Sequence, residues 1–283
     1  MQLIKQISEY VKYLKSTGLY ISLHYYGSLS SFFNNELISH NVHQNPYCMY
    51  VKSYGEIRKR CVECQKKVLE KCSKGDYFGM CHCGVEEFVY PIVCGLKPAG
   101  FISVSGYCTD FHKGIKKISA LCNEININPA PLQEIYKTAL SSDVPEKKYI
   151  DTLIFPLSAM FELAHIKINN SEVKNNSPEL YPAVLNYINL NYSQNITVDS
   201  IARHFSYSRS TISHLFKKNN EKSISEYINF LRLKEAALML SSSSMSITQI
   251  ALASGFSDPN YFSSVFKKYY SVSPQEFRKN KGV

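Results

Sequence analysis

The chain has 283 residues, of which 45% are hydrophobic and 19% charged, and its formal net charge is +9. A chain of this length is expected to form two or three domains, each with its own core. No apolar run approaches the roughly 18 residues of a membrane span, and residues 1–10 lack a secretory core. The sequence therefore predicts a cytoplasmic protein with no membrane partner, whose nine cysteines are free thiols or metal ligands rather than disulfides.

The first half of the chain alternates helical and strand patterns. Apolar residues from Leu3 to Leu14 recur at helical spacing, Gly18 ends that helix, and residues 19–23 are expected to form a strand followed by a turn at 26–28. The other expected elements are a helix over 56–72, a β region opening at 81–84, paired strands over 88–93 and 101–104 around a turn at 95–98, and helices over 115–122 and 132–140. Together they predict an α+β domain over residues 1–145.

A long helix is expected after Pro145, with Pro156 kinking it or dividing it. Its apolar seam is wide enough to pair with a second chain, so we expect a signalling and dimerisation helix over 146–168 and a homodimer. The seam consists of Ile150, Leu153, Ile154, Leu157, Met160, Phe161, Ala164 and Ile168. The polar run 169–178 has nothing to bury and is expected to be a linker.

The stretch 196–279 contains one pattern twice. Ile201-Ala202 returns as Ile250-Ala251, offset by 49 residues, and Phe216-Lys217-Lys218 returns as Phe266-Lys267-Lys268, offset by 50. Each copy predicts a short helix, a tight turn and a second helix. The expected N-caps are Thr197 or Asp199 and Ser208 in the first copy, and Ser246 and Ser257 or Asp258 in the second, with turns at Ser206 and Gly255.

Each second helix is expected to bury one side and to expose a polar side that suits a DNA major groove. The buried residues are Ile212, Leu215 and Phe216, and Phe262, Val265 and Phe266. The candidate base-contacting residues are Arg209, Ser210, Ser213 and His214 in the first copy and Asn260, Ser263 and Ser264 in the second. The candidate phosphate contacts are Lys217, Lys218, Lys267 and Lys268. Taken singly, each copy could also be an αα-hairpin in an ordinary core.

A helix of about eighteen residues, or roughly 27 Å, is expected between the copies, from Ile224 to Leu240. It would hold two reading helices about one DNA turn, ~34 Å, apart. Residues 178–283 carry 12 basic and 7 acidic side chains, against 19 and 15 over residues 1–168. The denser positive excess therefore lies where DNA binding is expected, and it would make that binding sensitive to salt.

These residues resemble the signature of the AraC/XylS family of transcription regulators. The matching string is Ile250-Ala251, Gly255-Phe256-Ser257-Asp258, Tyr261-Phe262, Val265-Phe266-Lys267-Lys268, Ser273-Pro274 and Phe277-Arg278, together with Tyr227-Ile228, Leu231-Arg232-Leu233, Ala236 and Met239-Leu240. The resemblance implies an all-α DNA-binding domain over 179–283, with two helix-turn-helix units joined by a linker helix. It also implies double-stranded DNA and RNA polymerase as partners.

Three positions depart from that family, which usually has glycine where this chain has Ser206, Glu221 and Ser271. A left-handed residue other than glycine costs roughly 1 kcal/mol. We therefore expect either that Asn220 takes the left-handed conformation or that these helix ends are remodelled.

Shorter strings over most of residues 5–167 resemble the PocR-type sensory domain, a PAS/GAF-like ligand-binding module. They are Gly18 with its following strand, Pro46-Tyr47-Cys48, Arg60-Cys61, Cys81-His82-Cys83-Gly84-Val85, Tyr90-Pro91-Ile92, and Gly95, Gly100 and Gly106. The resemblance implies a small organic effector. The candidate effector-binding residues are Cys48, Cys61, Cys81, His82 and Tyr90.

The cysteines of this half could instead hold a metal. Cys61, Cys64, Cys81 and Cys83 offer ligands for tetrahedral zinc or an iron-sulfur cluster. On a helix Cys61 and Cys64 would share a face, whereas in a strand Cys81 and Cys83 would point one way and His82 the other. The alternatives are thiols packed in a core or ligand pocket, and redox sensing.

The sequence thus favours a multidomain protein in which an α+β, PAS/GAF-like sensory domain precedes the DNA-binding domain. Its expected function is sequence-specific transcription regulation controlled by a small organic effector, and no residues at motif spacing indicate an enzyme. One alternative is a metal- or redox-responsive regulator. Others are a methyl-accepting DNA-repair regulator, which needs four convergent cysteines in a short zinc module, and a nonspecific, nucleoid-like DNA binder.

Overall fold

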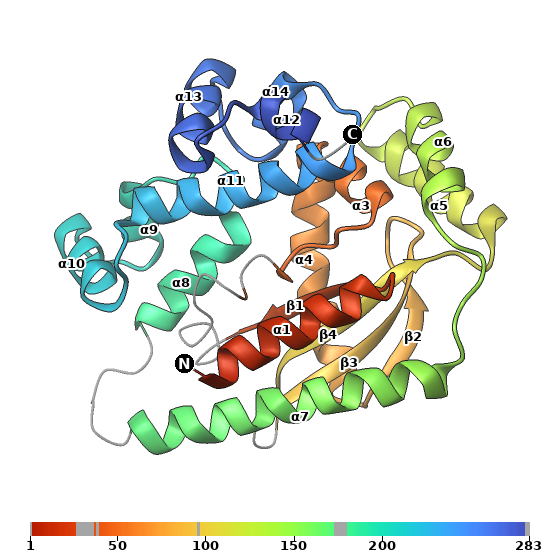
Figure 1. Cartoon of the computed structure of the whole chain (residues 1–283), viewed down its shortest axis with the longest axis horizontal. Helices are drawn as coiled ribbons and strands as arrows, with labels where there is room; N and C mark the ends of the chain where they lie inside the picture. The colour runs from red at the N-terminus through yellow and green to blue at the C-terminus, as the bar shows by residue number, and fades with distance from the viewer. Residues whose placement is uncertain (1, 27–36, 38–39, 95–96, 173–179, 281–283) are drawn as a thin grey trace. The chain divides into compact units, whose positions relative to one another are not determined.

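The computed structural model describes residues 2–26, 37, 40–94, 97–172 and 180–280, and they divide into two compact units (Figure 1). The first unit runs through the long helix α7 (Lys147–Glu172), and the second begins with α8 (Leu180–Asn191). No helix in the described ranges is both long and apolar enough to span a membrane. The turn expected at 26–28 lies largely outside these residues.

The first unit is built on a four-stranded antiparallel sheet of order β1-β4-β3-β2. The strands are β1 (Tyr20–Tyr25), β2 (Tyr77–Met80), β3 (Glu86–Cys94) and β4 (Lys97–Tyr107). Cys94 pairs with Lys97, so the expected turn at 95–98 is shorter than the sequence suggested. Apolar and β-branched residues such as Val89, Ile102 and Val104 are fully buried and form the centre of this sheet.

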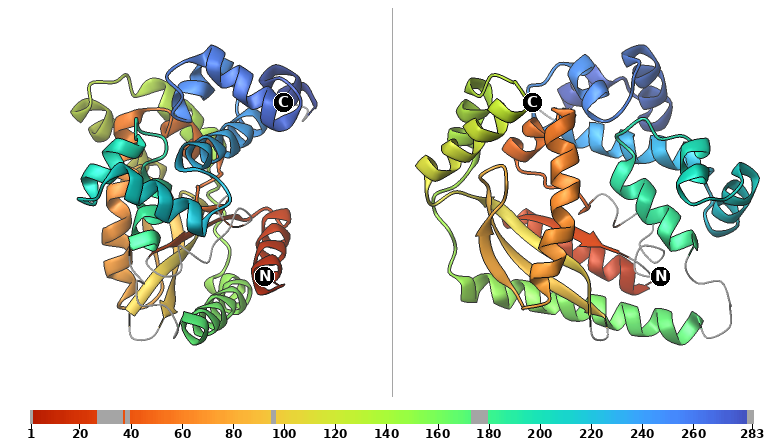
Figure 2. Two further views of the ribbon diagram at one scale, coloured as in Figure 1. Left: turned by 90° about the vertical axis from the view of Figure 1, so that its left-hand side faces the viewer. Right: turned by 180° about the vertical axis from the view of Figure 1, so that it is seen from behind.

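Helices cover both faces of the sheet. The side view in Figure 2 shows the sheet between α4 (Gly55–Cys72) and the pair formed by α1 (Gln2–Ser16) and α7. The apolar stripe of α1, which includes Ile7 and Leu14, is buried, and α4 buries Ile57 and Cys72 at its two ends. The strand segments and amphipathic helices expected from the sequence are therefore present as an α+β layer structure.

The long helix α7 differs from the expectation in where it ends and in what its seam contacts. Pro156 lies inside the helix, so of the two expected effects, a kink or a division, the division is excluded. The helix continues to Glu172, into the stretch expected to be a linker. Its apolar seam packs against α1 and β3 of the same unit. The seam residues that are fully buried there are Ile150, Ile154, Leu157, Phe161 and Ala164. The seam that suggested a second chain is therefore occupied by the protein's own sheet.

Three further helices close one end of the first unit: α3 (Pro46–Val51), α5 (Phe111–Glu124) and α6 (Ala130–Ala139). The sequence did not predict α3, which Asn45 caps by accepting a hydrogen bond from the Cys48 amide at 2.8 Å. A buried cluster that includes Tyr47, Ile118 and Tyr136 joins these helices to the chain around Cys83.

The second unit consists of helices alone. After α8 come α9 (Val198–His204), α10 (Arg209–Asn219), α11 (Ile224–Ser242), α12 (Ile247–Ala253), α13 (Pro259–Tyr270) and α14 (Pro274–Asn280). Figure 1 shows α11 running between the α9–α10 pair and the α12–α13 pair. Its 19 residues match the expected length, whereas α8 was not predicted as an element.

Candidate DNA-binding surface and sensory cavities

The two helix pairs of the second unit begin in the same way. Thr197 caps α9 in a capping box with Ser200, and Ser246 caps α12 in a capping box with Gln249. Each box satisfies backbone donors that a helix start would otherwise leave without partners. The duplicated sequence pattern therefore produces duplicated local structure.

The turns between the paired helices also correspond. Gly255 has a φ of 98° and Ser206 a φ of 59°, so both turns use a left-handed residue at the equivalent position. A Cβ on Gly255 would lie 2.6 Å from the carbonyl oxygen of Ser193, which adds a close approach to the backbone requirement. Ser206 instead bears the cost of a left-handed residue with a side chain.

The helix ends that depart from the family pattern are resolved differently from one another. Ser271 ends α13 in the left-handed conformation, with a φ of 65°. At the end of α10, Asn220 is extended, with φ −141° and ψ 139°. The expectation that Asn220 takes the left-handed conformation is therefore wrong, and the end of α10 is remodelled.

The second helices bury their expected apolar sides. Ile212 and Phe216 of α10 and Phe262 and Phe266 of α13 are fully buried, and Leu215 and Val265 are half-buried. Ser208 caps α10 by accepting from the Thr211 amide at 3.1 Å. At the start of α13, the cap is Asp258, which accepts from the Asn260 amide at 2.8 Å.

The opposite sides of α10 and α13 present polar and basic side chains to solvent. The exposed predicted residues are Arg209, Ser210, Ser213, His214, Lys217 and Lys218 on α10, and Asn260, Ser264, Lys267 and Lys268 on α13. Ser263 is half-buried and its hydroxyl donates to the Pro259 carbonyl at 2.9 Å. Arg209 forms an exposed ion pair with Asp199 of α9 at 3.2 Å.

Sequence reasoning missed two aromatic residues beside these faces. Tyr207, before α10, is 50% exposed, and Tyr261 on α13 is 51% exposed. The only signal for them in the sequence was their place near a helix start. Tyr207 directly precedes the cap Ser208, and Tyr261 lies three residues after the cap Asp258. The Tyr261 hydroxyl accepts from the Asn229 amide of α11 at 3.2 Å, so α11 fixes its position.

Side chains anchored to backbone carbonyls hold the second unit together around α11. Arg232 donates from Nε to the Tyr192 carbonyl at 2.6 Å and from Nη2 to the Gln194 carbonyl at 2.8 Å. The Tyr227 hydroxyl donates to Asn189 of α8 at 3.1 Å. Charge-assisted bonds of this kind favour a single arrangement of the helices that α11 contacts.

In the first unit, the chain around Cys81 forms a turn rather than the expected strand. The Cys81 amide donates to the Val85 carbonyl at 2.8 Å, and the Gly84 amide donates to the Cys81 carbonyl at 3.1 Å. Strand alternation therefore does not apply, and the expectation that His82 points away from Cys81 and Cys83 is wrong. His82 Nε2 lies 3.1 Å from Cys83 Sγ.

The turn meets the middle of α4. Cys61 Sγ lies 3.6 Å from His82 Nε2, and the ligand atoms of Cys61, His82 and Cys83 all lie within 4.8 Å of one another. Cys81 joins this cluster through a thiol hydrogen bond with Cys83. Cys64, one helical turn from Cys61, is not part of the three-residue cluster, although both were expected to act together. All eight cysteines whose side chains are described are free thiols.

Hydrogen bonds within this cluster change the acidity of its thiols. Bonding to Cys83 holds the pKa of Cys61 well below its ordinary value despite burial, and it also lowers the pKa of Cys81. The same bonds raise the pKa of Cys83. Burial lowers the pKa of His82, but the bond with Cys61 and the charges of Cys61 and Cys81 together outweigh burial, so the pKa ends above the ordinary value. The cluster therefore has thiolate character on Cys61 and Cys81, which favours metal binding and nucleophilic chemistry.

A small cavity of about 60 Å³ lies beside the cluster. Of the residues expected to bind an effector, Cys48, Cys61, Cys81 and His82 line it. The fifth, Tyr90, lies elsewhere, because its hydroxyl donates to Asp151 of α7 at 2.7 Å. Sequence reasoning had not selected His24, His43 and Glu87, which also line the cavity.

Burial controls the charge of those three residues. Burial, with a contribution from Lys52, lowers the pKa of His24 to about 3 and also lowers that of His43. Burial raises the pKa of Glu87 to about 8, and the Ser103 hydroxyl donates to its carboxyl group. At neutral pH the histidines are therefore uncharged and the carboxyl is largely protonated, so this wall of the cavity is polar without net charge.

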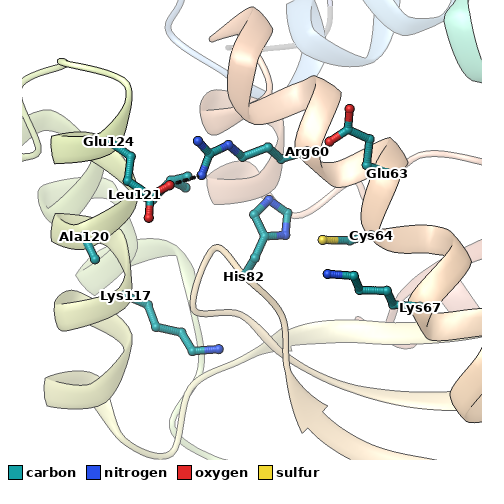
Figure 3. A pocket seen from close by; sticks show the side chains of 9 residues that line it. All are labelled: Arg60, Glu63, Cys64, Lys67, His82, Lys117, Ala120, Leu121 and Glu124. Atoms are coloured by element: carbon teal, nitrogen blue, oxygen red, sulfur yellow. Dashed lines mark hydrogen bonds and ion pairs between the residues drawn. The ribbon is translucent and has the colours of Figure 1, made fainter.

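A larger, open pocket of about 580 Å³ lies between α4 and α5 (Figure 3). Arg60 and Lys67 from α4 and Lys117 from α5 line it, together with the outer side of His82. Arg60 pairs with Glu124 across its rim. The pocket therefore combines basic side chains with a residue of the cysteine-histidine cluster.

Both units match known protein families. Residues 201–280 match the family model of a helix-turn-helix domain, and residues 29–161 match that of the sensory domain found in PocR. The Msm operon regulatory protein of Streptococcus mutans is 35% identical over 127 residues, which cover 45% of this chain and 44% of that protein. The lactose operon transcription activator of Staphylococcus xylosus is 33% identical over 138 residues, 49% of this chain and 48% of that one. The chain thus spans about half the length of these relatives.

Among solved structures, the C-terminal domain of the two-component response regulator yesN of Fusobacterium nucleatum is 31% identical, with a TM-score of 0.33. The match covers 34% of this chain and 94% of that domain. The Msm operon regulatory protein and the lactose operon transcription activator carry the names of regulators rather than of enzymes. With one sensory and one helix-turn-helix match, the chain combines a PocR-type sensory domain with a helix-turn-helix domain of the AraC type.

Proposed function

We propose that the protein binds specific DNA sequences through α10 and α13 and that a small ligand of the sensory unit controls this binding. The observation that carries the proposal is the repeated exposed polar side of these helices. Each follows a short capped helix and a left-handed turn residue, which supports the assignment of each pair as a helix-turn-helix unit. In that motif the second helix enters the major groove and its side chains contact base edges.

The chemistry of the exposed residues fits base and phosphate contacts. An asparagine such as Asn260 can bind adenine through two hydrogen bonds, and an arginine such as Arg209 can bind guanine in the same way. The pair that Arg209 makes with Asp199 is exposed and therefore weak, so DNA can replace it. Lys217 and Lys267, at the ends of the two helices, would neutralise phosphates.

The open pocket is the proposed effector site. Its volume of about 580 Å³ falls within the range of about 300 to 1,000 Å³ that small-molecule sites occupy. Arg60, Lys67 and Lys117 outnumber Glu63 and Glu124 on its wall, which favours an organic anion. The cavity of about 60 Å³ holds a few water molecules or an ion, which is too little for most metabolites. Of the expected effector residues, His82 lines both spaces.

Regulation by this protein would also need contact with RNA polymerase. We further propose that two copies of the chain form a homodimer. The second copy needs a surface other than the seam of α7, because that seam is buried against α1 and β3.

A competition assay tests base reading. Replacing His214 or Asn260 with alanine should weaken binding to a selected operator by about 1 to 3 kcal/mol and leave binding to random DNA nearly unchanged. Lys5→Ala, an exposed change on α1, serves as the control. Equal weakening on operator and random DNA would show that His214 and Asn260 contact only the backbone, as in a nonspecific DNA binder.

A further inference from the structure

We propose that the sensory unit binds one divalent transition-metal ion of the zinc class. The four ligands are Cys61, Cys81, His82 and Cys83. Three of their ligand atoms already lie within 4.8 Å of one another, and Cys81 lines the small cavity beside them. Three sulfurs and one imidazole nitrogen form one of the usual ligand sets of tetrahedral zinc.

The spacing of the ligand atoms agrees with such an ion. Zinc lies about 2.3 Å from sulfur and about 2.0 to 2.1 Å from nitrogen, so tetrahedral angles put sulfur and nitrogen about 3.6 Å apart. The distance from His82 Nε2 is 3.6 Å to Cys61 Sγ and 3.1 Å to Cys83 Sγ. For these two pairs of atoms, binding would require movements of a few tenths of an ångström. Cys81, which lies outside the 4.8 Å group, would have to move its thiol further toward the ion.

The backbone that carries these ligands is held firmly from outside. The Tyr47 hydroxyl donates to the Cys83 carbonyl at 2.9 Å, and the Tyr136 hydroxyl donates to the Gly84 carbonyl at 2.6 Å. Lys117 Nζ donates to the Cys81 carbonyl at 3.1 Å. Because these bonds fix the turn before any ion binds, the ligands are preorganised in the way that metal sites require.

The surrounding space favours an ion over an organic ligand at this place. The adjoining cavity has a volume of about 60 Å³, whereas the open pocket on the other side of His82 has about 580 Å³. Cys64 lines both the open pocket (Figure 3) and the small cavity, but it is not among the three clustered residues. The expected ligand set from the sequence is therefore revised, with His82 replacing Cys64.

Cobalt(II) titration of the full, reduced chain tests the site. We expect one Co²⁺ per chain, a thiolate-to-cobalt charge-transfer band, and the strong visible bands of a tetrahedral ion. One equivalent of Zn²⁺ should remove these bands. Weak, octahedral-type bands without charge transfer would overturn the proposal, and so would binding of more than one ion at similar affinity.

Two serine variants separate the ligands from their neighbour. Cys61→Ser should reduce Co²⁺ affinity by more than the roughly 10- to 100-fold that changes outside the ligand shell cause. Cys64→Ser lies on the same face of α4, one turn away, and should leave the affinity and spectrum unchanged. Equal losses in both variants would contradict the proposed ligand set.

A measurement on the unmutated chain guards against misfolded variants. Cysteine alkylation mapped by mass spectrometry should slow at Cys61 and Cys81 when Zn²⁺ is added and recover with a chelator. The alkylation rate of Cys64 should not change. The metal proposal fails if Zn²⁺ protects none of these thiols. It also fails if the protein is isolated with a Cys61–Cys83 disulfide and takes up no metal after reduction. The disulfide would then indicate a redox pair instead.

Discussion

The two units differ in where their polar side chains lie: in the interior of the sensory unit and on the surface of the helical unit. The sensory unit buries His24 and Glu87 beside a cysteine cluster, whereas the helical unit exposes the polar sides of α10 and α13. Burial changes charge, as the pKa of about 8 for Glu87 demonstrates, while exposed side chains stay available to a charged polymer in water. The sensory unit is therefore suited to respond to a ligand that enters its interior, and the helical unit to contact a charged polymer at its surface.

The largest expected effect contrasts two glycines, one from each unit. Gly255 has a positive φ, and a Cβ there would lie 2.6 Å from the Ser193 carbonyl oxygen, whereas Gly75 has a φ of 112° with nothing within 4 Å. Gly255→Ala should therefore lower the free energy of unfolding by about 3 kcal/mol, and Gly75→Ala by about 1 kcal/mol. Chemical denaturation measures both values. In hydrogen exchange, Gly255→Ala should deprotect α12 and α13 and leave the sheet unchanged. Equal effects of the two variants would refute the close approach.

Acid should weaken the sensory unit through its buried histidines. Burial, with Lys15 and Lys12 nearby, lowers the pKa of His40 to about 3, while an unfolded chain binds that proton near pH 6.5. The free energy of unfolding therefore falls as the pH drops below 6.5, and His40 alone should account for about 2 to 3 kcal/mol at pH 4.5.

The variant His40→Asn keeps an acceptor for Lys15, whose Nζ lies 2.9 Å from His40 Nδ1, but it cannot take up the proton. Between pH 7.5 and 4.5 the free energy of unfolding of this variant should fall by about 2 to 3 kcal/mol less than that of the parent. Hydrogen exchange in α1 measures the difference. An identical pH dependence in both proteins would mean that His40 is not buried and neutral.

A smaller effect is expected at the exposed lysines of the helical unit. Lys267→Ala should weaken binding to operator and random DNA alike, and it should reduce the slope of log affinity against log salt by about 1. Filter binding at several salt concentrations measures the slope. The matched variant Lys116→Ala, on exposed α5 of the sensory unit, should leave it unchanged. An unaltered slope in Lys267→Ala would remove that residue from the DNA surface.

The smallest expected effect concerns the turn of the first helix pair. Ser206 has a φ of 59°, so Ser206→Gly should raise the free energy of unfolding by about 0.5 to 1 kcal/mol, because glycine adopts this conformation without steric cost. Ser271→Gly, at a φ of 65°, should give a similar gain. A loss of stability in both variants would show that contacts of the serine side chains stabilise the fold by more than the left-handed conformation costs.

The helical unit could be predicted closely because its signals are local. The caps at Ser208 and Ser246 and the buried positions Phe216 and Phe266 follow from spacing within single helices. The helix α8 was missed although its buried residues Val184, Leu185 and Ile188 recur at helical spacing. The remodelled end at Asn220 could not be predicted either, since several conformations satisfy a helix end.

The sensory cavity was harder to predict because α3, α4, a turn and three strands build it together. Reading residues 81–83 as a strand put His82 on the wrong side, and only the hydrogen bonds that close the turn bring it to Cys61. The buried polar wall had a weak signal, namely His24 between Leu23 and Tyr25 and Glu87 before Phe88 in otherwise apolar strands. Sequence spacing identified most of the cluster, but not which residues face one another.

Selection of binding sites from a pool of random double-stranded DNA tests the central claim most directly. If α10 and α13 both read bases, the full chain should enrich sites with two short conserved blocks centred about 10 base pairs apart. His214→Ala should erase preference within one block and Asn260→Ala within the other. Enrichment of a single block, or of no sequence at all, would contradict the account.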